Sequence, residues 1–153
     1  MRFTVTVYAA EGETAVEGEV VDFDECEKMG TVHVSGATQK DAEDLAYGCV
    51  GGGPGWHPVF QTVRISSFLF MEQVKFDDER CVRVVYDHEI ERITVMDFHV
   101  NGGWVPASPE DILVMRRNDE FRAVIWSPRK YPAATEVLNR EDLPDWATSR
   151  LAA

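Results

Sequence analysis

Apolar residues that alternate with polar ones recur along this chain, and that period of two constrains its fold more than any other feature. Residues 2–8 alternate around Phe3, Val5 and Val7, and residues 59–65 alternate in the same way. Successive side chains of a β-strand point to opposite faces, so this spacing is typical of half-buried strands. The sequence therefore predicts a protein built mainly from β-sheet.

Further strands follow from the same pattern. We expect residues 14–24, with a bulge at Val20–Val21, to form the antiparallel partner of the first strand. Further strands are expected at 31–35, 80–86, 92–100, 112–117 and 121–127. Residues 80–100 and 112–127 each resemble a hairpin, and Asn101–Gly102 is a strong two-residue turn signal. Two segments stay open: residues 66–74 fit a strand or a helix, and Ser108–Pro109 offers an alternative helix start.

Three segments are predicted helices. Thr38 and Asp41 give a start resembling a capping box for a helix that ends near Gly48, and the tail is expected to be helical at 132–140 and 144–151. The predicted fold is therefore α+β: a mostly antiparallel sheet of seven to eight strands, open or barrel-like, with a short helix after the third strand and C-terminal helices. A chain of 153 residues suits one domain, so we expect a single domain over residues 1–153.

The charge is strongly acidic, and it is concentrated near the N-terminus. Twenty-seven acidic residues against fifteen basic ones give a net charge of −12, and residues 1–50 hold eleven acids and only three bases. Binding to a nucleic-acid backbone needs Lys and Arg to replace counterions, and an anionic membrane surface also attracts bases, so we expect neither partner. A basic protein partner remains.

The location is expected to be cytoplasmic. The chain has no run of about 20 apolar residues of the kind that spans a bilayer, and its N-terminus lacks the apolar segment of a signal peptide. Three cysteines without a Cys-x-x-Cys pair do not indicate a disulfide framework.

A row of carboxylates and two tryptophans are the candidate partner-binding residues. The acids suit a basic partner, and tryptophans beside glycine loops and turns commonly anchor partners. The alternative for the acids is a solvated strand that is protected from aggregation. The candidates are Glu17, Glu19, Asp22, Asp24, Glu25, Glu27, Trp56 and Trp104.

No metal or cofactor is expected. His88 lies at a predicted turn, and Asp97 and His99 lie at the far end of the paired strand, so these three residues do not suggest a metal site. Whether His57, His88 or His99 has a chemical role stays open.

A local resemblance concerns residues 35–46, Ser-Gly-Ala-Thr-Gln-Lys-Asp-Ala-Glu-Asp-Leu-Ala. This segment resembles the start of the helix in HicB-type antitoxins, with Gly36, Thr38, Asp41 and Ala42 matching the pattern. Ala37 takes the place of an aspartate, and the preceding Pro-Gly-Cys is absent. The remaining hundred residues show no counterpart.

The preferred hypothesis is a non-enzymatic acidic protein that occludes a basic surface of a partner protein, in the manner of an immunity protein, an antitoxin or a phage-encoded anti-defence inhibitor. The alternative is a small metal-independent enzyme or ligand-binding barrel of the cyclase or isomerase kind. Its aromatic cavity would be lined by Phe60, Phe68, Phe70, Tyr86 and Phe98, with His57, His99 or Asp97 as acid–base groups. A third hypothesis is an assembly subunit whose apolar edge pairs with copies of itself, so that a homo-oligomer forms.

Overall fold

The computed structural model describes residues 1–10, 23–51, 57–76 and 80–151. The chain divides into two compact units, Met1–Ile65 and Ser66–Ala153. The single domain expected over residues 1–153 stays a prediction. In the part of the chain described, no helix is both long and apolar enough to span a membrane.

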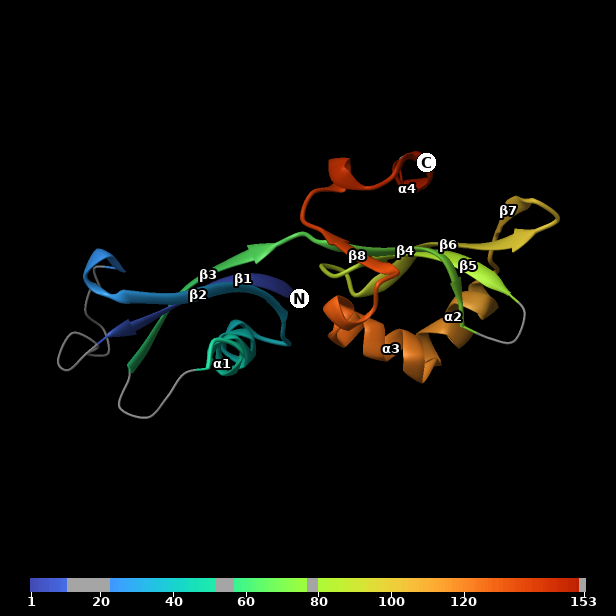
Figure 1. Ribbon diagram of the computed structural model, residues 1–153. Helices are drawn as coiled ribbons and strands as arrows, with labels where there is room; N and C mark the ends of the chain where they lie inside the picture. The colour runs from blue at the N-terminus through green and yellow to red at the C-terminus, as the bar shows by residue number, and fades with distance from the viewer. Residues whose placement is uncertain (11–22, 52–56, 77–79, 152–153) are drawn as a thin grey trace. The chain divides into compact units, whose positions relative to one another are not determined.

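The first unit is a three-stranded antiparallel sheet with one helix on one of its faces (Figure 1). Strand β1 (Arg2–Ala10) lies between β2 (Glu27–Ser35) and β3 (His57–Ile65). Helix α1 (Gln39–Cys49) covers the face on which Phe3, Val5 and Val7 are buried. The alternation of residues 2–8 and 59–65 therefore predicted two of these three strands.

Helix α1 begins where the sequence predicts. The Thr38 hydroxyl accepts a hydrogen bond from the Asp41 backbone N–H at 3.2 Å, which satisfies a donor that the helix itself leaves unpaired. Ala42 and Ala46 are buried against the sheet, whereas the Leu45 side chain is 46% exposed.

The partner of β1 differs from the prediction. Residues 14–22, which were expected to pair with β1, lie outside the described residues, and Phe23–Glu25 form a short 3-10 helix instead of the end of a strand. The strand that pairs with β1 is β2, which is longer than the predicted segment 31–35.

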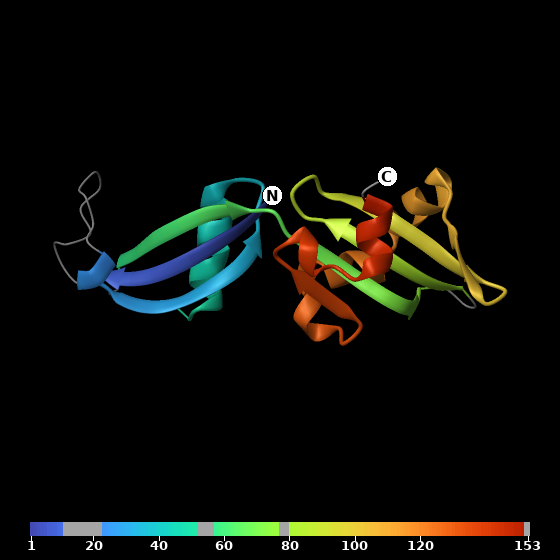
Figure 2. The same cartoon turned by 90° about the horizontal axis from the view of Figure 1, so that it is seen from above.

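The second unit is a five-stranded antiparallel sheet covered on both faces (Figures 1 and 2). The strands are β4 (Phe68–Lys75), β5 (Cys81–Asp87), β6 (Arg92–Val100), β7 (Gly103–Pro106) and β8 (Ala134–Val137), in the order β7-β6-β5-β4-β8. Residues 66–74, which the sequence left open, are therefore mostly strand. The described strands form two open sheets, and no closed barrel is found among them.

Two helices pack on one face of this sheet and one packs on the other. Helices α2 (Pro109–Arg117) and α3 (Asp119–Trp126) bury Met115, Phe121 and Val124 against Leu69, Val82 and other residues of one face. Helix α4 (Asp145–Leu151) lies on the opposite face, where Ala147 packs with Val85 and Val95. Strands β5 and β6 bury residues on both faces, as strands in the interior of a covered sheet do.

Two predictions for the second half of the chain are wrong. Residues 112–127 form helices instead of a hairpin, because Ser108 and Asp111 form a capping box for α2 and the Asn118 side chain caps α3. The tail segment 132–140 was expected to be helical, but Ala134–Val137 form β8, which pairs with β4. Of the two helices predicted in the tail, the one at 144–151 is confirmed, as α4.

Candidate protein-binding sites

The row of predicted partner-binding carboxylates, which we call the acidic stripe, runs from Glu17 to Glu27, and its described part lies at one end of the first unit. Asp24 and Glu27 are exposed, on either side of Cys26. The ring of Phe23 packs on Tyr8 with 4.7 Å between centroids, and the Cys26 N–H donates to the Phe23 carbonyl at 3.1 Å. These contacts hold the turn that carries both carboxylates.

The other predicted acids are not placed. Glu17, Glu19 and Asp22 lie outside the described residues, and so does Trp56; the Glu25 side chain is likewise outside the description. Within the described stripe, Glu27 opposes Ala9, which in turn opposes Pro58 on β3, so Glu27 marks one end of the sheet.

Trp104 is half-buried and already has two intramolecular contacts. Its ring lies 5.0 Å from the ring of His99, edge to face, and 4.6 Å from the guanidinium of Arg83. Arg83 also lies 4.7 Å from the ring of Trp146, in α4. One arginine therefore contacts two indole rings, and such cation–π contacts are strongest where water is excluded.

Arg83 also donates a hydrogen bond to the carboxylate of Asp97, which is fully buried and accepts a second hydrogen bond from Arg150. Asp97 accepts from Arg83 Nε at 2.8 Å through Oδ2, and from Arg150 Nη1 at 2.5 Å through Oδ1. We call Arg83, Asp97, Trp104, Trp146 and Arg150 the arginine–tryptophan cluster. It joins β5, β6, β7 and α4, so its first role is to hold α4 on the sheet.

Trp146 completes the attachment of α4. Its indole Nε1 donates to the Glu72 carboxylate. Glu72 lies in a bulge of β4, where the register with β5 shifts between Met71 and Val74 and Gln73 has a φ of 52°. Sequence reasoning did not find this cluster, although the hairpin register that places Arg83 opposite Asp97 is a signal that could have found that pair.

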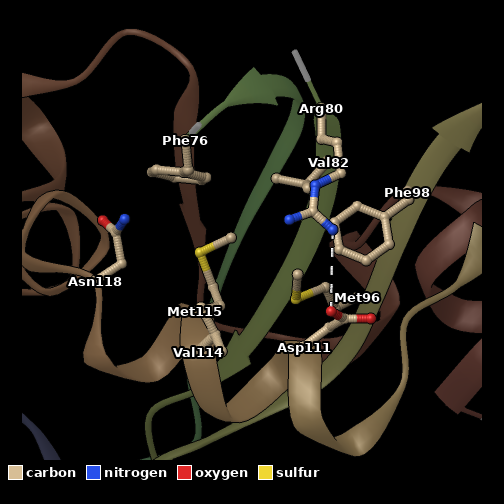
Figure 3. Close-up of a pocket in the computed structure, with 9 residues that line it drawn as sticks. All are labelled: Phe76, Arg80, Val82, Met96, Phe98, Asp111, Val114, Met115 and Asn118. Carbon is tan, nitrogen blue, oxygen red and sulfur yellow. Dashed lines mark ion pairs between the residues drawn. The ribbon is translucent and has the colours of Figure 1, made fainter. Parts of the chain in front are cut away.

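A half-open hollow lies on the opposite face of the second unit, between α2 and the sheet (Figure 3). It has a volume of about 100 Å³. Its lining is mostly apolar and includes two methionines, with an ion pair at the edge. The lining residues are Phe76, Arg80, Val82, Met96, Phe98, Asp111, Val114, Met115 and Asn118.

The edge of the hollow is polar. Arg80 Nη1 lies 4.0 Å from Asp111 Oδ1, and the Arg80 guanidinium lies over the ring of Phe98 at 4.9 Å (Figure 3). Val114 lines the hollow and is 68% exposed, so it lies at the mouth. Sequence reasoning missed this site because it interpreted residues 112–117 as a strand.

The size of the hollow limits what it can hold. Cavities that enclose small-molecule ligands usually measure about 300–1,000 Å³, several times more than this hollow. Its space suits a single apolar side chain. Methionine side chains adapt easily to different shapes, and they are common at surfaces that bind proteins.

The aromatic residues of the alternative hypothesis do not line one cavity. Phe60 packs in the core of the first unit. Phe68 and Phe70 pack on the α4 face of the five-stranded sheet, whereas Tyr86 and Phe98 pack on the face covered by α2 and α3. The five-stranded sheet therefore lies between Phe68 and Phe70 on one side and Tyr86 and Phe98 on the other.

The histidines are also dispersed. His57 is exposed at the start of β3, and His99 is exposed beside Trp104. His88 is buried after β5, where its N–H donates to the Ser67 carbonyl at 3.0 Å and its ring meets Tyr86 edge to face. Among the described residues, no group of three His, Cys, Asp or Glu side chains could hold a metal ion.

Among the described residues, Tyr86 has an environment that shifts its pKa. Burial raises the pKa of its phenol above the ordinary value of 10.0. The carboxylates of Glu91 and Asp87 raise this pKa further, whereas Arg116 lowers it. A tyrosine with a raised pKa stays protonated at neutral pH, so this environment does not prepare it as a base.

No protein-family model matches the chain, and neither a curated protein nor a solved structure matches it. The resemblance to HicB-type antitoxins therefore rests on residues 35–46 alone.

Proposed function

We propose that this protein is a non-enzymatic acidic binding protein that occludes a basic surface of a partner protein. The observation that carries the proposal is its charge: eleven acids against three bases in residues 1–50, with Asp24 and Glu27 exposed at the end of the first sheet. Immunity proteins, antitoxins and phage-encoded inhibitors of bacterial defence act by occlusion of this kind, and we place the protein in that class.

Two kinds of contact support this mechanism. The carboxylates of residues 17–27 attract a basic partner over a distance and speed its approach, since opposite charges steer diffusional encounter. The hollow below α2 then accepts an apolar side chain, and a filled apolar pocket lengthens the lifetime of a complex. We assign these roles to separate surfaces of the chain.

The tryptophans have unequal parts in the proposal. Trp56 stays a proposed anchor. Trp104 is half-buried, and Arg83 and His99 already contact its ring, so only part of its surface is available to a partner. We also propose that the protein acts in the cytoplasm. The three cysteines, all in the described part of the chain, are thiols, as is usual in a reducing compartment.

The proposal is tested by capture and reconstitution. The immobilised protein is incubated with lysate of its native host at low salt and then washed at about 0.5 M salt, where surface charge pairs are screened. Released proteins are identified, purified and mixed with this chain, and the stoichiometry and dissociation constant are measured at both salt concentrations. A basic partner that binds stoichiometrically and weakens with salt supports the proposal. A reconstituted partner that is acidic, or whose affinity does not respond to salt, contradicts it.

A further inference from the structure

Three of the four sheet edges in the described chain have features that hinder pairing with another strand. Strands β7 and β8 are only four residues long. Strand β2 carries one extra residue, Met29, where the register with β1 shifts, and it also contains Gly30 and Lys28. Short edges, bulges and edge lysines are the usual means by which proteins prevent edge-to-edge association.

Strand β3 lacks these features over most of its length. It has nine residues, and its register with β1 is unbroken from Arg2↔Ile65 to Ala10↔His57. Within the described ranges, β1 is its sole strand partner. Pro58, which has no backbone N–H to donate, hinders pairing with another strand only at the His57 end of β3. A long, regular edge of this kind is a template for pairing.

The sequence of β3 is complementary to itself in the antiparallel direction. When two copies pair about Gln61, Val59 opposes Val63, Phe60 opposes Thr62 and His57 opposes Ile65. The remaining pair joins Pro58 and Arg64, so no two like charges face each other. Directly opposed side chains are the unit of sheet stabilisation, and β-branched pairs are favourable among them.

Exposure of the strand agrees with this pairing. Val63 is 57% exposed on the first unit, and its neighbour Gln61 is also exposed. In the self-paired arrangement, the two Val59–Val63 pairs form on the same face on either side of the two-fold axis, because opposed residues of a ladder point to the same face. The pairing therefore covers apolar surface that the isolated strand leaves in water.

We infer that the β3 edge binds a second copy of this chain, giving a two-fold dimer with a continuous six-stranded sheet in the order β2-β1-β3-β3-β1-β2. The axis passes between the two Gln61 residues, and the α1 helices of both copies lie on the same face. Pairing of a single strand buries little area, so the dimer is reversible, with a dissociation constant in the micromolar range.

Sedimentation analysis over a series of protein concentrations tests the inference. The wild-type mass should rise with concentration from 17.3 kDa towards twice that value. The double substitution Gln61→Lys with Val63→Lys places lysines on the axis and against Val59, and it should weaken the dimer by about tenfold or more. Thr31→Lys is the matched control, because Thr31 is exposed at the centre of β2; it should leave the dimer unchanged.

A cross-link tests the register itself. Opposed residues in an antiparallel pair have Cα atoms about 4.5–5.5 Å apart, a separation that a disulfide spans. In a Cys49→Ser background, which removes an exposed thiol, Gln61→Cys should form a disulfide-linked dimer in the presence of diamide. Thr31→Cys in the same background should link far more slowly. Circular dichroism confirms that each variant is folded.

The inference is overturned by any of three results. The first is a wild-type protein that stays at the monomer mass over the whole concentration series. The second is a dimer that persists in the Gln61→Lys, Val63→Lys variant. The third is a Thr31→Cys variant that links as fast as Gln61→Cys. The acidic residues of the proposed partner surface are untouched in every variant, so these outcomes are independent of the proposed function.

Discussion

Arg150, in the last helix of the chain, donates a hydrogen bond from Nη1 to Oδ1 of the fully buried Asp97, across 2.5 Å. The other carboxylate oxygen accepts from Arg83 on the neighbouring strand at 2.8 Å. A buried carboxylate is costly without partners, and two arginines meet that requirement here. Since Asp97 and Arg150 are 53 residues apart in the chain, the pair fixes where α4 docks.

Loss of the Asp97 charge should destabilise the second unit. In Asp97→Asn, two arginines lose their anionic partner while the Arg83 side chain stays mostly buried. Breaking a buried ion pair from one side typically costs several kcal/mol, so we expect the free energy of unfolding to fall by about 3 kcal/mol. Urea denaturation measures this change.

The control is an exposed aspartate that also pairs with an arginine. Asp119 pairs with Arg122, but its side chain is 91% exposed. Exposed pairs contribute little, so Asp119→Asn should change the free energy of unfolding by less than about 0.5 kcal/mol. Equal effects of the two substitutions would mean that burial of Asp97 has no energetic consequence.

Trp146 should matter much more for stability than Trp126. Trp146→Ala removes the contact with Arg83 and the hydrogen bond to Glu72. For this half-buried tryptophan we expect a loss of about 2 kcal/mol. Trp126 is 72% exposed, so Trp126→Ala should stay within about 0.5 kcal/mol of wild type. Thermal unfolding compares the two variants, and the reverse order of stability would refute the packing of α4.

Gly36 should tolerate no side chain. A Cβ at this position would lie 2.8 Å from the Ala42 backbone N and 2.9 Å from the Thr38 carbonyl O. Because backbone atoms cannot move aside easily, Gly36→Ala should cost about 2 kcal/mol. Gly48, within α1, has nothing within 4 Å of such a Cβ, so Gly48→Ala should stabilise the protein by about 0.5 kcal/mol. Chemical denaturation of the two variants measures both changes in the free energy of unfolding, which should have opposite signs.

Stability should fall in alkaline solution because of Tyr86. Its folded pKa lies above 10.0 through burial and the nearby Glu91 and Asp87. The unfolded chain then releases the phenolic proton first, so the stabilisation is complete below the unfolded pKa and is lost as pH rises through the folded one. Denaturation from about pH 8 to about pH 11 should show this decrease. Tyr86→Phe should reduce the slope; an unchanged slope would assign it to other groups.

The strands that the sequence predicts well are those with strict alternation. Phe3, Val5 and Val7 share a face in β1. Asn101 and Gly102, with φ of 50° and 81°, form the turn between β6 and β7 that their sequence predicts. Residues 112–115 are apolar in succession, and a run of this kind does not distinguish strand from helix. The capping box that Ser108 and Asp111 form at the start of α2 stabilises the helix.

Long-range contacts explain what could not be predicted. Ala134–Val137 form a strand because β4 offers its edge; the paired residues are 63 positions apart for Met71↔Ala134 and 69 for Phe68↔Val137. Tertiary pairing of this kind overrides local propensity. The hollow likewise needs Phe76 and Arg80 to meet α2. The pairing of Arg83 with Asp97 could be derived from the hairpin register, whereas the approach of Arg150 could not.

If carboxylates of the first unit guide a basic partner to its site, the association rate must depend on them. With the identified partner, stopped-flow rates should be measured over a series of salt concentrations for Asp24→Lys with Glu27→Lys. The control is Glu120→Lys with Glu141→Lys, two exposed acids of the second unit that give the same change in net charge. We predict that the first variant associates about tenfold more slowly at low salt, with a weaker salt dependence, and that the control stays close to wild type. Equal rates for the two variants would contradict the claim.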